Sequence, residues 1–120
     1  FREVDNPKNI HFFKSLPIEF YAPLLKNAAC ILGNSSSGIR ESAFLGTPTV
    51  NIGTRQNGRE RGKNVVDVTY ETAAIVSAVR SQIDYGCYEP DYLFGDGHAA
   101  TKIVDVLSNC SISIQKTITY

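Results

Sequence analysis

Apolar residues come in short bursts along the chain, and these bursts alternate with stretches of helical spacing. Short continuous runs of apolar and β-branched residues predict strands at 10–13, 29–33, 49–52 and 64–68. Apolar positions three or four residues apart predict helices at 18–28, 39–45, 71–83 and about 98–108. Strands and helices that alternate over short connections are typical of βαβ units. We therefore predict an α/β fold with a Rossmann-like, doubly wound parallel sheet.

The predicted sheet is small for a fold of this kind. We therefore expect further units of a longer protein to complete it, and one sheet edge to be exposed in this piece. The chain has 120 residues, which corresponds to one domain. It begins at Phe1 and contains no Met, which also fits a fragment.

Composition excludes several classes of partner. The 12 Lys and Arg residues balance 12 Asp and Glu residues, so there is no basic excess for nucleic acid or a membrane surface. No apolar run approaches the roughly 18 residues of a membrane span. Cys30, Cys87 and Cys110 lack the C-x-x-C spacing of a zinc site, and neither His11 nor His98 has a ligand-type neighbour at helical spacing. We expect a cytoplasmic domain without a metal.

A polar segment directly after the second predicted strand is the strongest local signal. Residues 34–38 read Asn-Ser-Ser-Ser-Gly and precede a predicted helix; we call them the serine loop. Ligands of doubly wound sheets bind outside the carboxyl ends of the strands, and a helix N-terminus there favours phosphate. Three serine hydroxyls add donors, and Gly38 lets a ligand approach the backbone. The alternative is a single serine N-cap within an ordinary polar loop.

Two neighbouring features extend this hypothesis. Glu41 lies about one turn into the predicted helix, where its carboxylate can accept two ribose hydroxyls or simply complement the helix dipole. The loop 53–63 follows the next strand and should emerge at the same sheet edge. Its arginines can neutralise a diphosphate, although such loops are often only solvated.

A second glycine motif, G-x-G-x-x-A, spans residues 95–100. No predicted strand precedes it, as a dinucleotide-binding loop would require. A turn in which Asp96 caps the last helix explains it better. The chain also lacks a Walker A pattern, a G-x-S-x-G motif and a nearby Ser/His/Asp set.

Two sequence blocks taken together carry a family resemblance. Residues 33–41 read GNSSSGIRE, and residues 46–60 read GTPTVNIGTRQNGRE. With them the chain, from about Asn9 to Leu107, resembles the C-terminal domain of hydrolysing UDP-N-acetylglucosamine 2-epimerases, which form N-acetylmannosamine for sialic acid synthesis. The resemblance implies a two-domain GT-B-type fold. Residues 1–120 would then be an incomplete C-terminal UDP-binding domain, with the N-terminal catalytic domain absent.

The resemblance also implies specific UDP contacts and a reaction. Ser35 and Ser36 would hold the diphosphate, Glu41 the ribose, Leu16 the uridine, and Arg55 would lie in the loop beside them. UDP would be eliminated across C1–C2 to give a 2-acetamidoglucal, and water would then add. The acidic and histidine groups for this would lie upstream, so no catalytic residue is expected here. No cofactor is implied, and family members form dimers or tetramers.

The same residues allow other interpretations. A sibling epimerase acting on UDP-N,N′-diacetylbacillosamine would share this UDP half, as would another GT-B nucleotide-sugar enzyme. A phosphosugar-binding regulatory module also uses a serine-rich loop at a strand end, and would bind hexose phosphates without a preference for uridine. A purely structural module would bind nothing at the serine loop.

Overall fold

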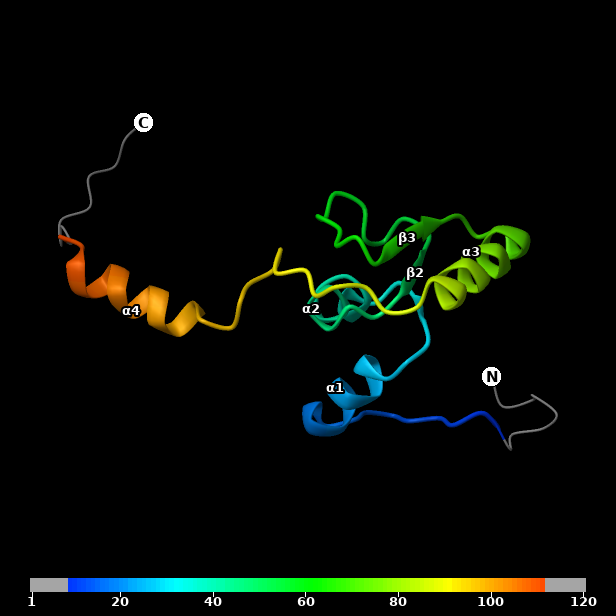
Figure 1. Cartoon of the computed structure of the whole chain (residues 1–120), viewed down its shortest axis with the longest axis horizontal. Helices are drawn as coiled ribbons and strands as arrows, with labels where there is room; N and C mark the ends of the chain where they lie inside the picture. Colours follow the sequence, from blue (N-terminus) through cyan, green and yellow to red (C-terminus); the bar gives the residue numbers. More distant parts are fainter. Residues whose placement is uncertain (1–8, 112–120) are drawn as a thin grey trace.

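The computed structural model describes residues 9–111 and confirms the predicted α/β architecture (Figure 1). Three strands form one parallel sheet in the order β1-β2-β3, with helices packed around it. The elements in chain order are α1 (Ile18–Lys26), β1 (Ile31–Gly33), the 3₁₀ helix η2 (Ser36–Gly38), α2 (Glu41–Leu45), β2 (Thr49–Ile52), β3 (Val65–Val68), α3 (Thr72–Tyr85) and α4 (Ala99–Asn109).

The sheet has β2 at its centre. Thr49 is the register partner of both Ile31 on β1 and Val65 on β3. Within the described residues β1 pairs only with β2, so its other edge carries no strand, as expected for this small sheet. Leu32 on β1 is 53% exposed, whereas Val50 on β2 is fully buried. The core therefore lies around the central strand β2, and the outer edge of β1 is exposed.

The strand predicted at Ile10–Phe13 is absent: this segment has no regular secondary structure. Phe12 and Phe13 are both more than 60% exposed. A strand exists only through its ladder to a neighbour, and nothing in residues 9–111 pairs with this run. The run has the apolar composition of a strand, but the prediction of a strand is wrong because no described segment pairs with it.

The helix predicted at 39–45 is confirmed as α2 (Glu41–Leu45), and the 3₁₀ helix η2 (Ser36–Gly38) precedes it. Ser35 Oγ accepts the N–H of Ser37, and the carbonyl of Ser36 accepts the N–H groups of Ile39 and Arg40. These bonds form a 3₁₀ turn first, so α2 begins only at Glu41. It ends at Gly46, whose φ of 70° is the left-handed conformation that favours glycine.

Buried polar side chains dominate the interior around β2. Gln82 Nε2 of α3 donates to the carbonyls of Thr49 (3.0 Å) and Asn64 (2.9 Å), and Tyr88 Oη donates to Gln82 Oε1 at 2.6 Å. Asn64 Nδ2 donates to Ser42 Oγ and the Thr47 carbonyl. These bonds join the start of β2, the segment before β3 and α3. Apart from glycines, five apolar residues are buried among the described ones: Leu25, Ile39, Ala43, Pro48 and Val50.

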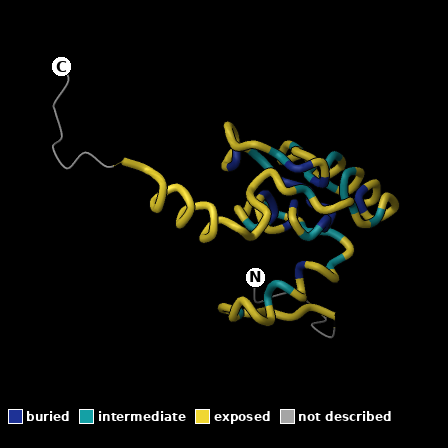
Figure 2. The backbone as a smooth tube through the Cα atoms, turned by 60° about the vertical axis from the view of Figure 1, so that its left-hand side comes forward, coloured by how far each residue is buried: buried dark blue, intermediate teal, exposed yellow. Residues whose placement is uncertain are grey.

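The first and last helices expose the faces that their spacing predicts as core. On α1 only Leu25 is buried, and Phe20 is 64% exposed. Helix α4 leads away from the sheet, and none of its residues is buried (Figure 2). The sequence predicts both helices correctly, but neither finds a complete partner within residues 9–111. No helix in this part of the chain is both long and apolar enough to cross a membrane.

Candidate functional site

The serine loop lies at the carboxyl end of β1, where the sequence places it. Ser35 and Ser36 are exposed, while Gly38 is buried against β2. A Cβ on Gly38 would lie 3.0 Å from Thr49 Cγ2, so a larger residue there would require the Thr49 side chain to shift. Because α2 has only five residues, the expected help from a helix dipole is small. Serine hydroxyls and loop N–H groups are thus the main donors available for an anion.

The loop 53–63 folds back onto the serine loop. Arg55 Nη1 lies 3.4 Å from the carbonyl oxygen of Asn34 and 3.5 Å from its Oδ1. Gln56 is 2% exposed, and its Nε2 donates to the same Asn34 carbonyl at 2.7 Å. The two loops therefore meet at one sheet edge, as expected. Arg55 stays exposed beside Ser35, with only long contacts to Asn34 among the described residues.

Arg61 anchors the far end of this loop to the sheet. Its Nε donates to Asp67 Oδ2 at 3.1 Å, Nη2 donates to the Gln56 carbonyl at 2.7 Å, and Nη1 donates to the Arg59 carbonyl. Asp67 also accepts a hydrogen bond from Asn51 Nδ2, its register partner on β2. Partial burial raises the pKa of Asp67, but the bonds from Asn51 and Arg61 outweigh it, and the pKa is lowered overall.

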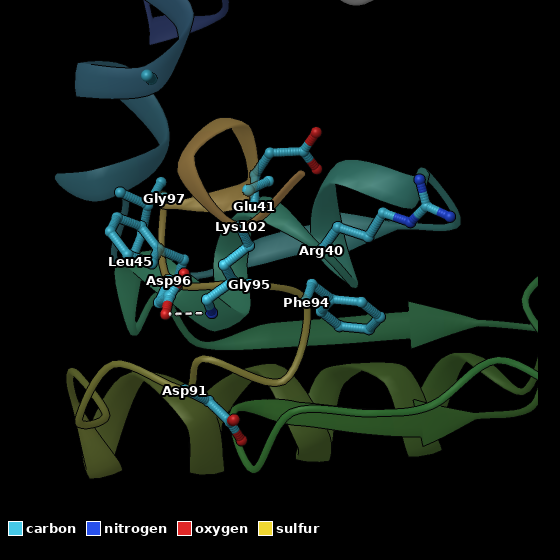
Figure 3. A pocket seen from close by; sticks show the side chains of 12 residues that line it. Arg40, Glu41, Leu45, Asp91, Phe94, Gly95, Asp96, Gly97 and Lys102 are labelled. Atoms are coloured by element: carbon cyan, nitrogen blue, oxygen red, sulfur yellow. Dashed lines mark hydrogen bonds and ion pairs between the residues drawn. The ribbon is translucent and has the colours of Figure 1, made fainter. Parts of the chain in front are cut away.

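A cavity of about 700 Å³ lies between α1, α2 and the segment that leads into α4 (Figure 3). Its wall is mostly apolar, with Phe44 and Phe94 among its lining residues. Arg40 and Glu41 line it from the start of α2, and Asp96 and Lys102 line it from the other side. Glu41 makes no hydrogen bond to another described side chain, so its carboxylate is free to accept donors from a ligand.

The five predicted UDP contacts do not share one cavity. Arg55 lies beside the serine loop that holds Ser35 and Ser36. Glu41 follows η2 closely in the chain but lines the separate cavity. Leu16 is half-buried just before α1, and no described hydrogen bond joins it to the other four. The structure therefore brings Arg55 to the serine loop, while Glu41 lines the cavity and Leu16 lies just before α1.

The G-x-G-x-x-A motif forms a turn, as the sequence analysis predicts. Asp96 Oδ1 accepts the N–H of His98, and Asp96 Oδ2 accepts a bond from Lys102 Nζ at 2.7 Å. These contacts hold the pKa of Asp96 below its usual value. His98 occupies the N-cap position itself, so Asp96 acts just before the helix. No strand precedes the turn in the described chain.

Several residues that shape the site are not among the predicted contacts. Asn34, Gln56, Arg61 and Asp67 act through bonds between segments, and hydrophobic periodicity carries no information about such bonds. For Asn34, Gln56 and Arg61 the available signal was their position within or beside the two sequence blocks, whereas Asp67 lies outside both. In the described residues no three His, Cys, Asp or Glu side chains are grouped as a metal site would require.

Comparison with known proteins agrees with this architecture. A family model described as UDP-N-acetylglucosamine 2-epimerase matches residues 1–108. A UDP-N-acetylglucosamine 2-epimerase of Neisseria meningitidis is 36% identical over 110 residues, covering 87% of this chain and 29% of the relative. A hydrolysing UDP-N,N′-diacetylbacillosamine 2-epimerase of Legionella pneumophila is 33% identical over 112 residues, covering 93% of this chain and 29% of the relative.

A third relative, named polysialic acid biosynthesis protein P7, comes from Escherichia coli. It is 43% identical over 70 residues, covering 58% of this chain and 18% of the relative. The matched regions thus span less than a third of each of these three relatives. The family model, in contrast, covers nearly the whole of this chain. The chain belongs to the UDP-N-acetylglucosamine 2-epimerase family.

Proposed function

We propose that this chain is the UDP-binding part of a hydrolysing UDP-N-acetylglucosamine 2-epimerase that releases UDP and N-acetylmannosamine. The observation that carries the proposal is the position of Arg55 over the serine loop. Serine hydroxyls and a guanidinium at the carboxyl end of a parallel strand are well suited to a diphosphate. Membership of the epimerase family is the reason for proposing that the diphosphate belongs to a uridine nucleotide with a sugar attached.

Arg55 is available for a ligand because its contacts are weak. Both described bonds from Nη1 are at the upper limit of hydrogen-bond length, and the side chain is exposed. A diphosphate beside Ser35 and Ser36 would offer Arg55 charged acceptors in place of a neutral carbonyl. Charge-assisted bonds of that kind are about twice as strong as neutral ones. We therefore assign Arg55, Ser35 and Ser36 to the diphosphate.

Glu41 and Leu16 would hold the nucleoside. The carboxylate of Glu41 has no competing side-chain donor among the described residues and lines an apolar cavity (Figure 3). It can accept both ribose hydroxyls, as acidic residues do in dinucleotide-binding folds. Leu16 would contact the uracil.

In the proposed reaction this chain would stabilise the leaving group. Elimination across C1–C2 places negative charge on the departing UDP, and Arg55 with the serine hydroxyls would bind that charge. Removal of the C2 proton needs a base, and delivery of water needs a second group. We assign neither of these to residues of this chain, so its proposed part is binding and electrostatic support.

The sugar has a second candidate. The Legionella relative is named as an epimerase of UDP-N,N′-diacetylbacillosamine, while the Escherichia coli relative is named for polysialic acid biosynthesis. The residues assigned above contact only the UDP portion, which both sugars share. An assay of UDP release from UDP-N-acetylglucosamine and from UDP-N,N′-diacetylbacillosamine, side by side, would distinguish the two. We expect faster release from UDP-N-acetylglucosamine; preference for the bacillosamine derivative would overturn the sugar assignment.

Calorimetric titration with UDP, and with glucose 6-phosphate for comparison, tests the nucleotide assignment. We expect selective UDP binding that Arg55→Ala weakens about tenfold or more and Ser36→Ala weakens several-fold, since bonds to a charged phosphate are lost. Arg80→Ala, on the exposed surface of α3, is the matched control and should bind normally. Preference for glucose 6-phosphate would instead support the phosphosugar module.

The ribose assignment needs a separate variant. Glu41→Gln keeps the shape of the side chain but removes its charge, so it should weaken binding of UDP several-fold. Inorganic pyrophosphate has no ribose, and its affinity should stay the same in the variant. Equal UDP affinity of wild type and Glu41→Gln would remove Glu41 from the site.

A further inference from the structure

The loop that carries Arg55 is tied to the sheet at its other end. Arg61 and Asp67 form an ion pair, and the same guanidinium donates to the carbonyls of Gln56 and Arg59. Three of its nitrogens thus contact three different residues, two of them in the loop itself. The Arg61 side chain is only 21% exposed. This burial indicates that its guanidinium has a structural role and is not available to bind a ligand.

The contacts continue without a break from the sheet to the serine loop. Asn51 of β2 donates to Asp67 of β3, and Asp67 accepts from Arg61. Arg61 holds the backbone of Gln56, and the buried Gln56 side chain donates to the Asn34 carbonyl. Asn34 is the first residue of the serine loop and the neighbour of the Arg55 guanidinium.

We propose that Arg61 is a positioning residue for the diphosphate site, acting through Gln56 to place Arg55 and Asn34. This rests on the function proposed above. Arg61 itself does not bind the phosphates in this assignment, which separates it from Arg55 although both arginines lie in the same loop. Neighbouring Arg59 contributes only its carbonyl to the network, because no described bond involves its side chain.

The chemistry of the side chain makes the proposal specific. A guanidinium is planar and presents donors in several directions, so it can contact a carboxylate and two carbonyls together. The ammonium of lysine is a compact point charge and cannot span the same three acceptors. Arg61→Lys therefore keeps the net charge of the loop but should release Gln56, and with it the alignment of Arg55.

Titration with UDP and with uridine, in the intact chain and its variants, tests the role. Arg61→Lys should lower the affinity for UDP about tenfold and leave the affinity for uridine unchanged within about twofold, because only the diphosphate site is displaced. Arg80→Lys is the matched control, with the same substitution on an exposed helix, and should leave both affinities unchanged. Circular dichroism and thermal unfolding confirm that each variant is folded.

A double-mutant cycle with Asp67→Asn sharpens the test. Both substitutions break the same chain of contacts, so the double variant should bind UDP about as weakly as Arg61→Lys alone. Full UDP affinity in Arg61→Lys would overturn the role of Arg61 while leaving the proposed function intact. An equal loss of affinity for UDP and for uridine would also overturn the role of Arg61, because it would show a general structural effect. Absence of UDP binding in the wild-type chain would instead overturn the proposed function, and this role with it.

Discussion

The sheet region and the terminal helices of this chain are stabilised in different ways. Around β2 the buried side chains are mostly polar, and hydrogen bonds from Asn64 and Gln82 link α3 and the segment before β3 to β2 and α2. On α4 the apolar side chains are exposed, with Ile103, Val104 and Leu107 all more than half accessible. Figure 2 shows this division, with most of the buried residues in the sheet region and α4 exposed throughout.

The difference shows where this chain specifies its own structure. Hydrogen bonds between buried groups require definite partners, so the network around Gln82 and Asn64 permits one arrangement of the strands. Apolar contacts are less directional, and an exposed apolar helix face specifies a helix without specifying its neighbour. The serine loop and the loop 53–63 border this polar region, whereas the cavity that Glu41 lines also borders α1 and α4. Substitutions should therefore have large effects in the sheet region and small effects on α4.

The largest effect is expected at Gln82. Gln82→Leu would remove the Gln82 donor from the Thr49 carbonyl and the acceptor of the half-buried Tyr88 hydroxyl, while the Asn64 carbonyl would keep its bond from the Thr49 N–H. Unsatisfied buried groups cost about 1–3 kcal/mol each, so we expect a loss of about 3 kcal/mol in the free energy of unfolding. Urea denaturation measures it. Arg80→Leu, on the exposed surface of the same helix, should change stability by less than about 0.5 kcal/mol; equal effects would contradict the comparison.

A backbone contact at the end of α2 should produce the next largest effect. Gly46 has a φ of 70°, and a Cβ there would collide with the carbonyl oxygen of Tyr88. Gly46→Ala should therefore destabilise the chain by about 2–3 kcal/mol, from strain and collision together. Gly58 has a φ of 77° but open space around it, so Gly58→Ala should cost only about 1 kcal/mol. Similar losses would show that the Tyr88 contact is unimportant.

A smaller, pH-dependent effect is expected from Asp67. Its pKa is lowered because the bonds from Asn51 and Arg61 outweigh partial burial. Its stabilising contribution is therefore complete above the unfolded pKa of about 3.9 and disappears as the pH falls through the lower folded value. The stability difference between wild type and Asp67→Asn should thus narrow between pH 5 and pH 2. A difference that is constant over this range would contradict the ion pair with Arg61.

The smallest effect is expected on α4. Val104 is 60% exposed, so Val104→Ala removes little buried area and should change stability by less than about 0.5 kcal/mol. Val50 provides the contrast, since it is fully buried on the central strand. Val50→Ala should cost about 2 kcal/mol or more by the same denaturation measurement. A large loss for Val104→Ala would show that α4 packs on the sheet region after all.

Local patterns in the sequence were enough for most of the elements. Apolar periodicity predicted the helices near α1, α2, α3 and α4 and the strands near β1, β2 and β3, within two residues of each end. The serine loop and the loop 53–63 were correctly expected at the same sheet edge, because parallel strands present their carboxyl ends together. The two sequence blocks also indicated the family that the comparison then established.

Contacts between distant residues were decided only in three dimensions. Periodicity cannot show that Asp67 lies opposite Asn51, or that Gln56 reaches Asn34, because strand register and the path of the connecting loop determine both. It also could not show that Ile10–Phe13 has no strand beside it. Helical spacing depends on neighbours three or four residues away, whereas sheet pairing and buried hydrogen bonds depend on partners that are 16 to 33 residues distant here.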